Sequence, residues 1–249
     1  MDLLRGPGPG TAALPVTRLL TVERDGNPLR RYGHVSPHIG KISPVDAGAL
    51  REIAALAADA LPRDAAGRTL VVGMAESALL LSWFLAARLG EDTELRFTTR
   101  ETRGNAQSRR FLEPHSHGPV HALALPPGRS YARVVIVEDE LTTGSTLRNL
   151  LLAVRDVAPL YRVVALSDRR PPGERERLRD EMAALGVELS VLDLSESTND
   201  ARPPRPDAAR FARGPARGGL GANPFERCPA VFEGAVHDLR RRCLGLRPG

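Results

Sequence analysis

Short apolar runs alternate with amphipathic stretches through the middle of the sequence. Continuous runs of β-forming residues predict strands, and these runs cover Thr69–Gly73, Glu94–Thr98, Arg133–Val137, Arg162–Leu166 and Val187–Leu192. Apolar residues at helical spacing predict helices over Asp46–Leu56, Glu76–Leu89, Ser145–Val157 and Arg175–Leu185. Buried strands that alternate with helices are typical of an α/β fold, with an open, mostly parallel sheet flanked by helices on both faces.

The segments outside this pattern lead to different expectations. We expect residues 1–16 to be disordered and residues 17–200 to form one domain, which starts with a small N-terminal hood, residues 17–45, containing an antiparallel hairpin. Residues 201–249 form a Pro/Arg/Gly-rich C-terminal segment, which predicts a linker and tail with at most one docking helix. Thr99–Gly118 is polar and lacks periodicity, which predicts a functional or disordered loop before a short strand over Val120–Leu125.

Composition narrows the class of protein. The net charge of +5 comes almost entirely from arginine, because Lys41 is the only lysine. We attribute this excess to genomic base composition, so nucleic acid is not an expected partner. No run of about 18 apolar residues occurs, and no membrane span is expected. Cys228 and Cys243, without a secretion signal, predict reduced thiols in a cytoplasmic protein and neither a disulfide nor a metal site.

The most informative segment joins the strand Val134–Val137 to the helix that starts near Ser145. Two adjacent acids, Glu138 and Asp139, stand at the end of the strand, and we call them the acidic pair. Carboxylates repel a phosphate but accept hydrogen bonds from sugar hydroxyls or hold a divalent cation. The following backbone N–H groups lie at a helix N-terminus and favour a bound phosphate. They belong to Thr143, Gly144, Ser145 and Thr146, and the hydroxyl of Thr142 adds a further donor, so we call Thr142–Thr146 the phosphate loop. Together the two features predict a ribose 5-phosphate site.

This segment resembles the phosphoribosyl pyrophosphate (PRPP) motif of type I phosphoribosyltransferases. The motif is an apolar strand, two acids, two variable residues (here Glu140 and Leu141) and Thr-Thr-Gly-x-Thr. The resemblance implies an enzyme that binds PRPP with Mg²⁺ and transfers the phosphoribosyl group to a base-like or nitrogen acceptor, releasing pyrophosphate. It implies that Glu138 and Asp139 orient the ribose near the developing cation, and that Glu140 lies in the PRPP-binding loop. Relatives are commonly homodimers.

A second segment agrees with this resemblance. Gly73, Met74, Ala75 and Glu76 follow the first core strand and resemble the family's pyrophosphate loop, the name we use for them. The polar stretch after residue 99 resembles the family's mobile lid. Arg100 directly follows a strand there and is the candidate for neutralising pyrophosphate, whereas we interpret Arg109 and Arg110 as part of a solvated basic loop.

A narrower resemblance is to an orotate-phosphoribosyltransferase-like subfamily of bacterial tellurite-resistance and stress gene clusters. It depends on segments such as Gly73–Glu76, Thr98–Arg100 and Glu113–His117, and it implies synthesis of a nucleoside-like metabolite. Orotate-type enzymes also carry an Asp-Arg pair near the position of Asp168-Arg169, so Arg169 is a candidate for recognising the acceptor. A surface turn at Arg169 is the alternative.

Several alternatives stay open at this point. Glu113, His115, His117 and His121 suit a metal cluster, ligand recognition or a structural role. The general base is Glu140, His115 or His117, or no base is needed because the acceptor is anionic. The alternative functions are a non-catalytic PRPP- or nucleotide-sensing regulator that binds nucleic acid through its arginines, and a subunit whose tail recruits a partner.

Overall fold

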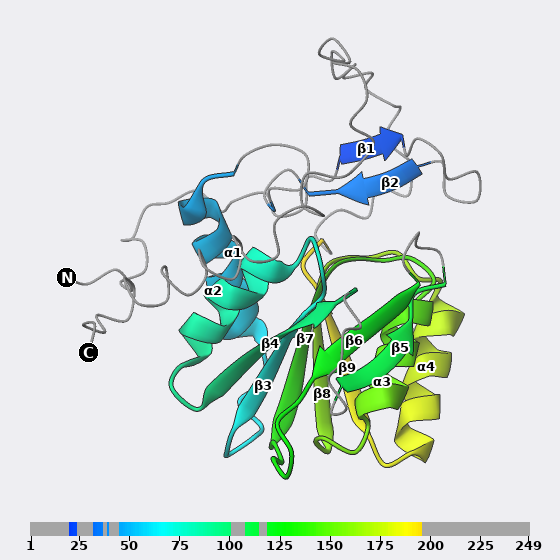
Figure 1. Ribbon diagram of the computed structural model, residues 1–249. Coiled ribbons are helices and arrows are strands. Elements are labelled where there is room, and N and C mark those ends of the chain that lie inside the picture. The colour runs from blue at the N-terminus through cyan, green and yellow to red at the C-terminus, as the bar shows by residue number, and fades with distance from the viewer. Residues whose placement is uncertain are drawn as a thin grey trace, which may run out of the picture. The chain divides into compact units, whose positions relative to one another are not determined.

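The computed structural model describes residues 20–23, 32–36, 39, 45–100, 108–114 and 119–195. A seven-stranded sheet with the order β5-β6-β4-β3-β7-β8-β9 forms the centre of this part of the chain (Figure 1). The parallel strands are β3 (Thr69–Gly73), β4 (Thr93–Thr99), β7 (Arg133–Leu141), β8 (Leu160–Asp168) and β9 (Glu188–Asp193). Two antiparallel strands, β5 (Ser108–Leu112) and β6 (Val120–Ala124), complete one edge. The predicted open, mostly parallel sheet is confirmed.

Helices cover both faces of this sheet. Figure 1 shows α1 (Ala47–Ala60) and α2 (Leu79–Leu89) on one side and α3 (Ser145–Val154) and α4 (Pro172–Ala184) on the other. The central strands are therefore covered from solvent on both faces, and every residue of Val134–Val137 is fully buried. Burial on both faces explains why this strand is continuously apolar. None of the described helices is long and apolar enough to cross a membrane.

The expected hood hairpin is present as a separate two-stranded sheet. In it, β1 (Leu20–Glu23) pairs antiparallel with β2 (Tyr32–Val35). Val35 and Ile39 are buried and belong to the main hydrophobic cluster. The predictions for residues 1–16 and 201–249, including the tail helix, lie outside the described residues.

The prediction of a loop over Thr99–Gly118 was wrong in part. Strand β5 lies inside it and pairs with β6 from Ser108↔Ala124 to Leu112↔Val120. The sequence of β5 lacks the apolar pattern of a buried strand, because Phe111 is its one buried residue and Arg109 and Arg110 are exposed. Helix α2 also starts later than expected, at Leu79, since the preceding residues form a turn.

Glu94 on β4 links two segments that are distant in sequence. Its carboxylate accepts hydrogen bonds from Arg96 Nη2 at 2.6 Å, Arg129 Nη1 at 2.6 Å and Tyr131 Oη at 2.9 Å. Burial by itself raises the pKa of Glu94, but these donors outweigh it and hold the pKa below its usual value. The carboxylate therefore ties the loop before β7 to β4.

We expect Glu94→Gln to lower the free energy of unfolding by about 1–3 kcal/mol, because charged hydrogen bonds are lost. The pKa of Glu94 in the folded state lies below the unfolded value of 4.5. The ionised carboxylate therefore contributes its full stabilisation at a pH above 4.5, and this contribution disappears as the pH falls through the folded-state pKa. Urea unfolding of both proteins from pH 7 to pH 3 should show the difference shrinking below about pH 4.5. A Glu91→Gln control should match the wild type, and a difference that grows with acidification would contradict this account.

Candidate functional site

The candidate site lies where the carboxyl ends of β3 and β7 meet. Strand β3 pairs with β4 on one side and with β7 on the other, so the strand order reverses at β3. Ligands of open α/β sheets bind at such reversals. The Met74 N–H donates to the Val137 carbonyl at 3.1 Å. This bond holds the start of the pyrophosphate loop against β7, directly before the acidic pair.

The acidic pair belongs to β7 itself, because the strand extends through Leu141. Glu138 and Asp139 are half-buried, and the Asp139 N–H donates to Glu138 Oε1 at 2.9 Å. Successive side chains of a strand point to opposite faces. Glu138 and Glu140 therefore share one face, and Asp139 lies on the other. Both predicted catalytic residues are thus held on regular backbone at the edge where the loops emerge.

The phosphate loop enters α3 at the left-handed residue Gly144, the N-cap of the helix, with φ 76° and ψ 1°. A Cβ atom there would lie 2.8 Å from Arg170 Cδ, so both the backbone angle and the space require glycine. Thr143 Oγ1 and Ser145 Oγ are 3.0 Å apart, and the Arg148 N–H donates to the Gly144 carbonyl at 2.8 Å. The loop therefore presents hydroxyls and the first amides of α3 at one helix end.

A buried ion pair lies behind the phosphate loop. Arg170 Nε and Nη2 donate to the two carboxylate oxygens of Asp168 at 2.9 Å and 2.7 Å, and both side chains are 2% exposed. Arg175 Nε lies 3.3 Å from Asp168 Oδ2. The Arg170 side chain in turn packs against Gly144. The pair fixes the position of the phosphate loop on the end of β8.

The predicted acceptor residue, Arg169, lies beside this pair. Its N–H donates to the Leu141 carbonyl at 2.8 Å, which continues the pairing of β7 and β8, and its side chain is exposed. Sequence reasoning did not identify Arg170. The available signal was its spacing from Asp168, since residues two apart on extended backbone share one face.

A pocket of about 150 Å³ adjoins the phosphate loop and includes Arg148, Arg170 and Arg177 in its lining. The positive charge there is largely balanced. Arg148 Nε donates to Glu181 Oε2 at 2.7 Å, and Arg177 Nη1 lies 3.0 Å from Glu174 Oε1. The hydrogen bond from Arg148 lowers the pKa of Glu181. The Arg148–Glu181 pair joins α3 to α4, whereas Glu174 and Arg177 pair within α4.

The pyrophosphate loop begins at a position that only glycine fits. A Cβ atom on Gly73 would lie 2.2 Å from Ser82 Oγ and 2.8 Å from Phe97 Cδ1. The Ala75 N–H donates to Thr98 Oγ1 at 2.8 Å, and the peptide bond between Ala75 and Glu76 is cis. Since the N–H groups of Met74 and Ala75 are used within the protein, Glu76 carries the one amide of this loop after β3 that these bonds do not use.

Arg100 lies between two carboxylates. Its Nη2 is 3.1 Å from Glu113 Oε2, and its Nε is 3.8 Å from Glu76 Oε1 in the pyrophosphate loop. His121 is buried and places Nε2 2.8 Å from the same Glu113 oxygen. Among the described residues, no three His, Cys, Asp or Glu side chains form a metal-binding group. His115, His117 and both cysteines lie outside the described residues.

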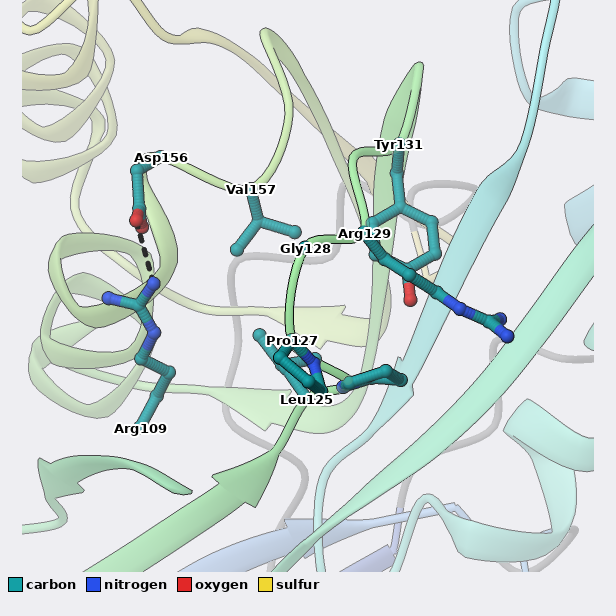
Figure 2. Close-up of a pocket in the computed structure, with 9 residues that line it drawn as sticks. Arg109, Leu125, Pro127, Gly128, Arg129, Tyr131, Asp156 and Val157 are labelled. Carbon is teal, nitrogen blue, oxygen red and sulfur yellow. Dashed lines mark hydrogen bonds and ion pairs between the residues drawn. The ribbon is translucent and has the colours of Figure 1, made fainter. Parts of the chain in front are cut away.

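A larger pocket of about 370 Å³ lies near the opposite end of β7, around the loop that leads into that strand (Figure 2). Figure 2 shows Arg109 facing Asp156, with Nη2 2.7 Å from Oδ2. Arg129 and Tyr131 are the residues that bind Glu94. The charged side chains that line this larger pocket are thus engaged in structural pairs. Its lining includes no residue of the acidic pair, the phosphate loop or the pyrophosphate loop.

The chain resembles known proteins in sequence and in fold. A family model described as "Phosphoribosyl transferase" matches residues 19–198, well over half of the chain. No curated protein matches the sequence. Adenine phosphoribosyltransferase of Trypanosoma brucei has a similar structure, with a TM-score of 0.52 and 13% identity over 75% of this chain and 80% of that one. The Leishmania tarentolae enzyme gives 0.51 and 16%, over 71% and 83%. The sheet and its flanking helices therefore form the type I phosphoribosyltransferase fold.

We expect Asp168→Asn to lower the free energy of unfolding by about 3–5 kcal/mol, because it leaves the buried Arg170 charge uncompensated. The matched control is Asp156→Asn, which breaks an arginine pair in which both side chains are roughly half exposed and should lower it by less than about 1 kcal/mol. Guanidinium unfolding of the three proteins measures both effects. Equal losses in the two variants would contradict the role of burial.

Proposed function

Because the chain belongs to the phosphoribosyltransferase family, we propose that it binds PRPP with Mg²⁺ and transfers the phosphoribosyl group to a base-like or nitrogen acceptor. The ligand would lie at the carboxyl ends of β3 and β7. The observation that carries this proposal is the position of the acidic pair at the end of β7, five residues before Gly144 at the start of α3. An acid pair suited to ribose hydroxyls thus adjoins amides suited to a 5-phosphate.

The chemistry exchanges one bond at C1 of the ribose. The C1–O bond to pyrophosphate breaks, and the leaving group takes the electron pair. The lone pair of the acceptor nitrogen forms the new C1–N bond, and any proton on that nitrogen is lost. Positive charge develops on the sugar during this exchange, so the half-buried Glu138 and Asp139 would orient the ribose hydroxyls and stabilise the charge.

The phosphate loop would bind the other end of the substrate. Thr142, Thr143, Ser145 and Thr146 supply hydroxyls and amides, and the end of α3 favours negative charge. At the opposite end, the Glu76 amide of the pyrophosphate loop and Arg100 would receive the pyrophosphate. Holding both ends fixes C1 between them, which lowers the barrier by orientation.

The oxygen donors of the acidic pair suit Mg²⁺. Since the described residues hold no three-ligand group, we propose that the substrate supplies most of the oxygens around the ion, with Glu138 or Asp139 contributing to its shell. Bound Mg²⁺ would neutralise charge on the leaving pyrophosphate.

A finer proposal concerns the acceptor. We propose that this chain is a member of the orotate-like subfamily, that it makes a nucleoside-like metabolite, and that Arg169 recognises an acidic acceptor. The exposed Arg169 side chain at the end of β8, with its backbone fixed to Leu141, supports this role. An anionic acceptor nitrogen would need no general base.

Calorimetric titration of PRPP with Mg²⁺ into the wild type and Asp139→Asn tests the central proposal. We expect binding by the wild type and a dissociation constant about 10- to 100-fold higher in the variant, because a hydrogen bond to a charged group is lost. Glu176→Gln, on the exposed face of α4, is the matched control and should bind as the wild type does. EDTA should weaken binding.

The proposal fails if the folded wild type does not bind PRPP, either alone or with nucleobases and orotate present. If PRPP binds, pyrophosphate release with a panel of acceptors tests the finer proposal. Loss of release in Arg169→Ala with a neutral acceptor as well as an acidic one would exclude the proposed role of Arg169.

A further inference from the structure

Glu113 is fixed at the turn of the β5–β6 hairpin by both its backbone and its side chain. The Glu113 N–H donates to the Pro119 carbonyl at 2.7 Å, and its Oε2 lies 2.8 Å from His121 Nε2. A carboxylate only accepts hydrogen bonds, so the His121 Nε2 must carry the hydrogen. The position of this acid is therefore set by the hairpin and not by the solvent.

His121 is a rigid support for this carboxylate. Its side chain is 1% exposed, and its ring centroid lies 5.3 Å from that of Phe111 on the facing strand. The Nδ1 atom has no hydrogen-bond partner among the described residues. Burying an unpaired polar atom is unfavourable. A position held by packing alone would favour an apolar residue, so the bond through Nε2 accounts for a histidine here.

The same Glu113 oxygen holds Arg100. Nη2 of Arg100 lies 3.1 Å from Glu113 Oε2, and its Nε lies 3.8 Å from Glu76 Oε1 in the pyrophosphate loop. The Glu113 side chain is 29% exposed, whereas that of Glu76 is 58% exposed. The shorter contact and the less exposed partner identify Glu113 as the firmer of the two contacts. A flexible arginine is thus kept beside the pyrophosphate loop.

The hairpin also contacts the helix that follows the phosphate loop. Asn149 Nδ2 on α3 donates to the Leu112 carbonyl at 2.8 Å, one residue before Glu113. The hairpin turn therefore contacts both halves of the candidate site.

We infer that Glu113, oriented by His121, is a positioning residue that aims Arg100 at the pyrophosphate end of the substrate. This inference rests on the proposed PRPP site. A preset arginine loses less side-chain entropy when an anion binds. The alternative role is competition, in which Glu113 binds Arg100 and keeps it from the anion. Removing the Glu113 carboxylate weakens pyrophosphate binding if Glu113 positions Arg100, and strengthens it if Glu113 competes.

The test compares two ligands that occupy different parts of the site. Calorimetry of Glu113→Gln in the full chain should show inorganic pyrophosphate with Mg²⁺ binding about tenfold more weakly. Ribose 5-phosphate, which engages the acidic pair and the phosphate loop, should bind within about twofold of the wild type. The ribose 5-phosphate result also reports whether the variant is folded.

Variants of the two partners separate positioning from a general structural effect. Adding Glu113→Gln to Arg100→Ala should cause no further loss of pyrophosphate affinity beyond about twofold, because Glu113 acts through Arg100. His121→Gln, which keeps a donor, should retain more affinity than His121→Phe.

Tighter pyrophosphate binding by Glu113→Gln, unchanged binding, or equal loss of both ligands would overturn the inference while leaving the proposed function in place. Failure of the wild type to bind PRPP would overturn both, whereas a wild type that binds PRPP but not pyrophosphate would overturn the inference alone.

Discussion

The parallel pairing of β3 with β7 is the constraint on which the site depends. Its register runs from Thr69↔Arg133 to Gly73↔Val137, so β3 ends level with the residue of β7 that directly precedes the acidic pair. The bond from the Met74 amide to Val137 extends this pairing by one residue. Two segments about sixty residues apart in the sequence, the pyrophosphate loop and the acidic pair, therefore emerge at one edge. If β3 and β7 were antiparallel, their carboxyl ends would lie at opposite ends of the sheet, and the two segments would be far apart.

Sequence reasoning succeeded where the signal was local. The buried strand β7 and the start of α3 after Gly144 lie in one short segment, and each depends on backbone rules that act over a few residues. It failed where long-range packing decides. Strand β5 has one buried residue, Phe111, and is stabilised by pairing with β6. Arg169 and Arg170 are chemically identical neighbours, and only the packing against Gly144 and Asp168 distinguishes the exposed one from the buried one.

The arginine-rich composition has a structural use in the described part of the chain. Arg162 is 3% exposed and pairs with both Asp64 and Glu188, which joins the loop after α1 to the edge strand β9. Arg133 binds the Pro62 carbonyl at 2.7 Å, beside the same loop. A guanidinium group reaches several acceptors at once in a fixed plane. Many of these side chains therefore connect the ends of strands and helices, and the net charge by itself is a poor guide to a partner.

The phosphate end of the candidate site is supported by contacts from several parts of the sheet and its helices. The start of α3 is connected to three other elements: Arg170 packs on Gly144, Arg148 bonds to Glu181 on α4, and Asn149 bonds to the Leu112 carbonyl. A ligand group that binds there meets donors already in place and loses little free energy in ordering them. Such preorganisation makes the helix end the anchor of the site, against which the rest of a bound molecule is oriented.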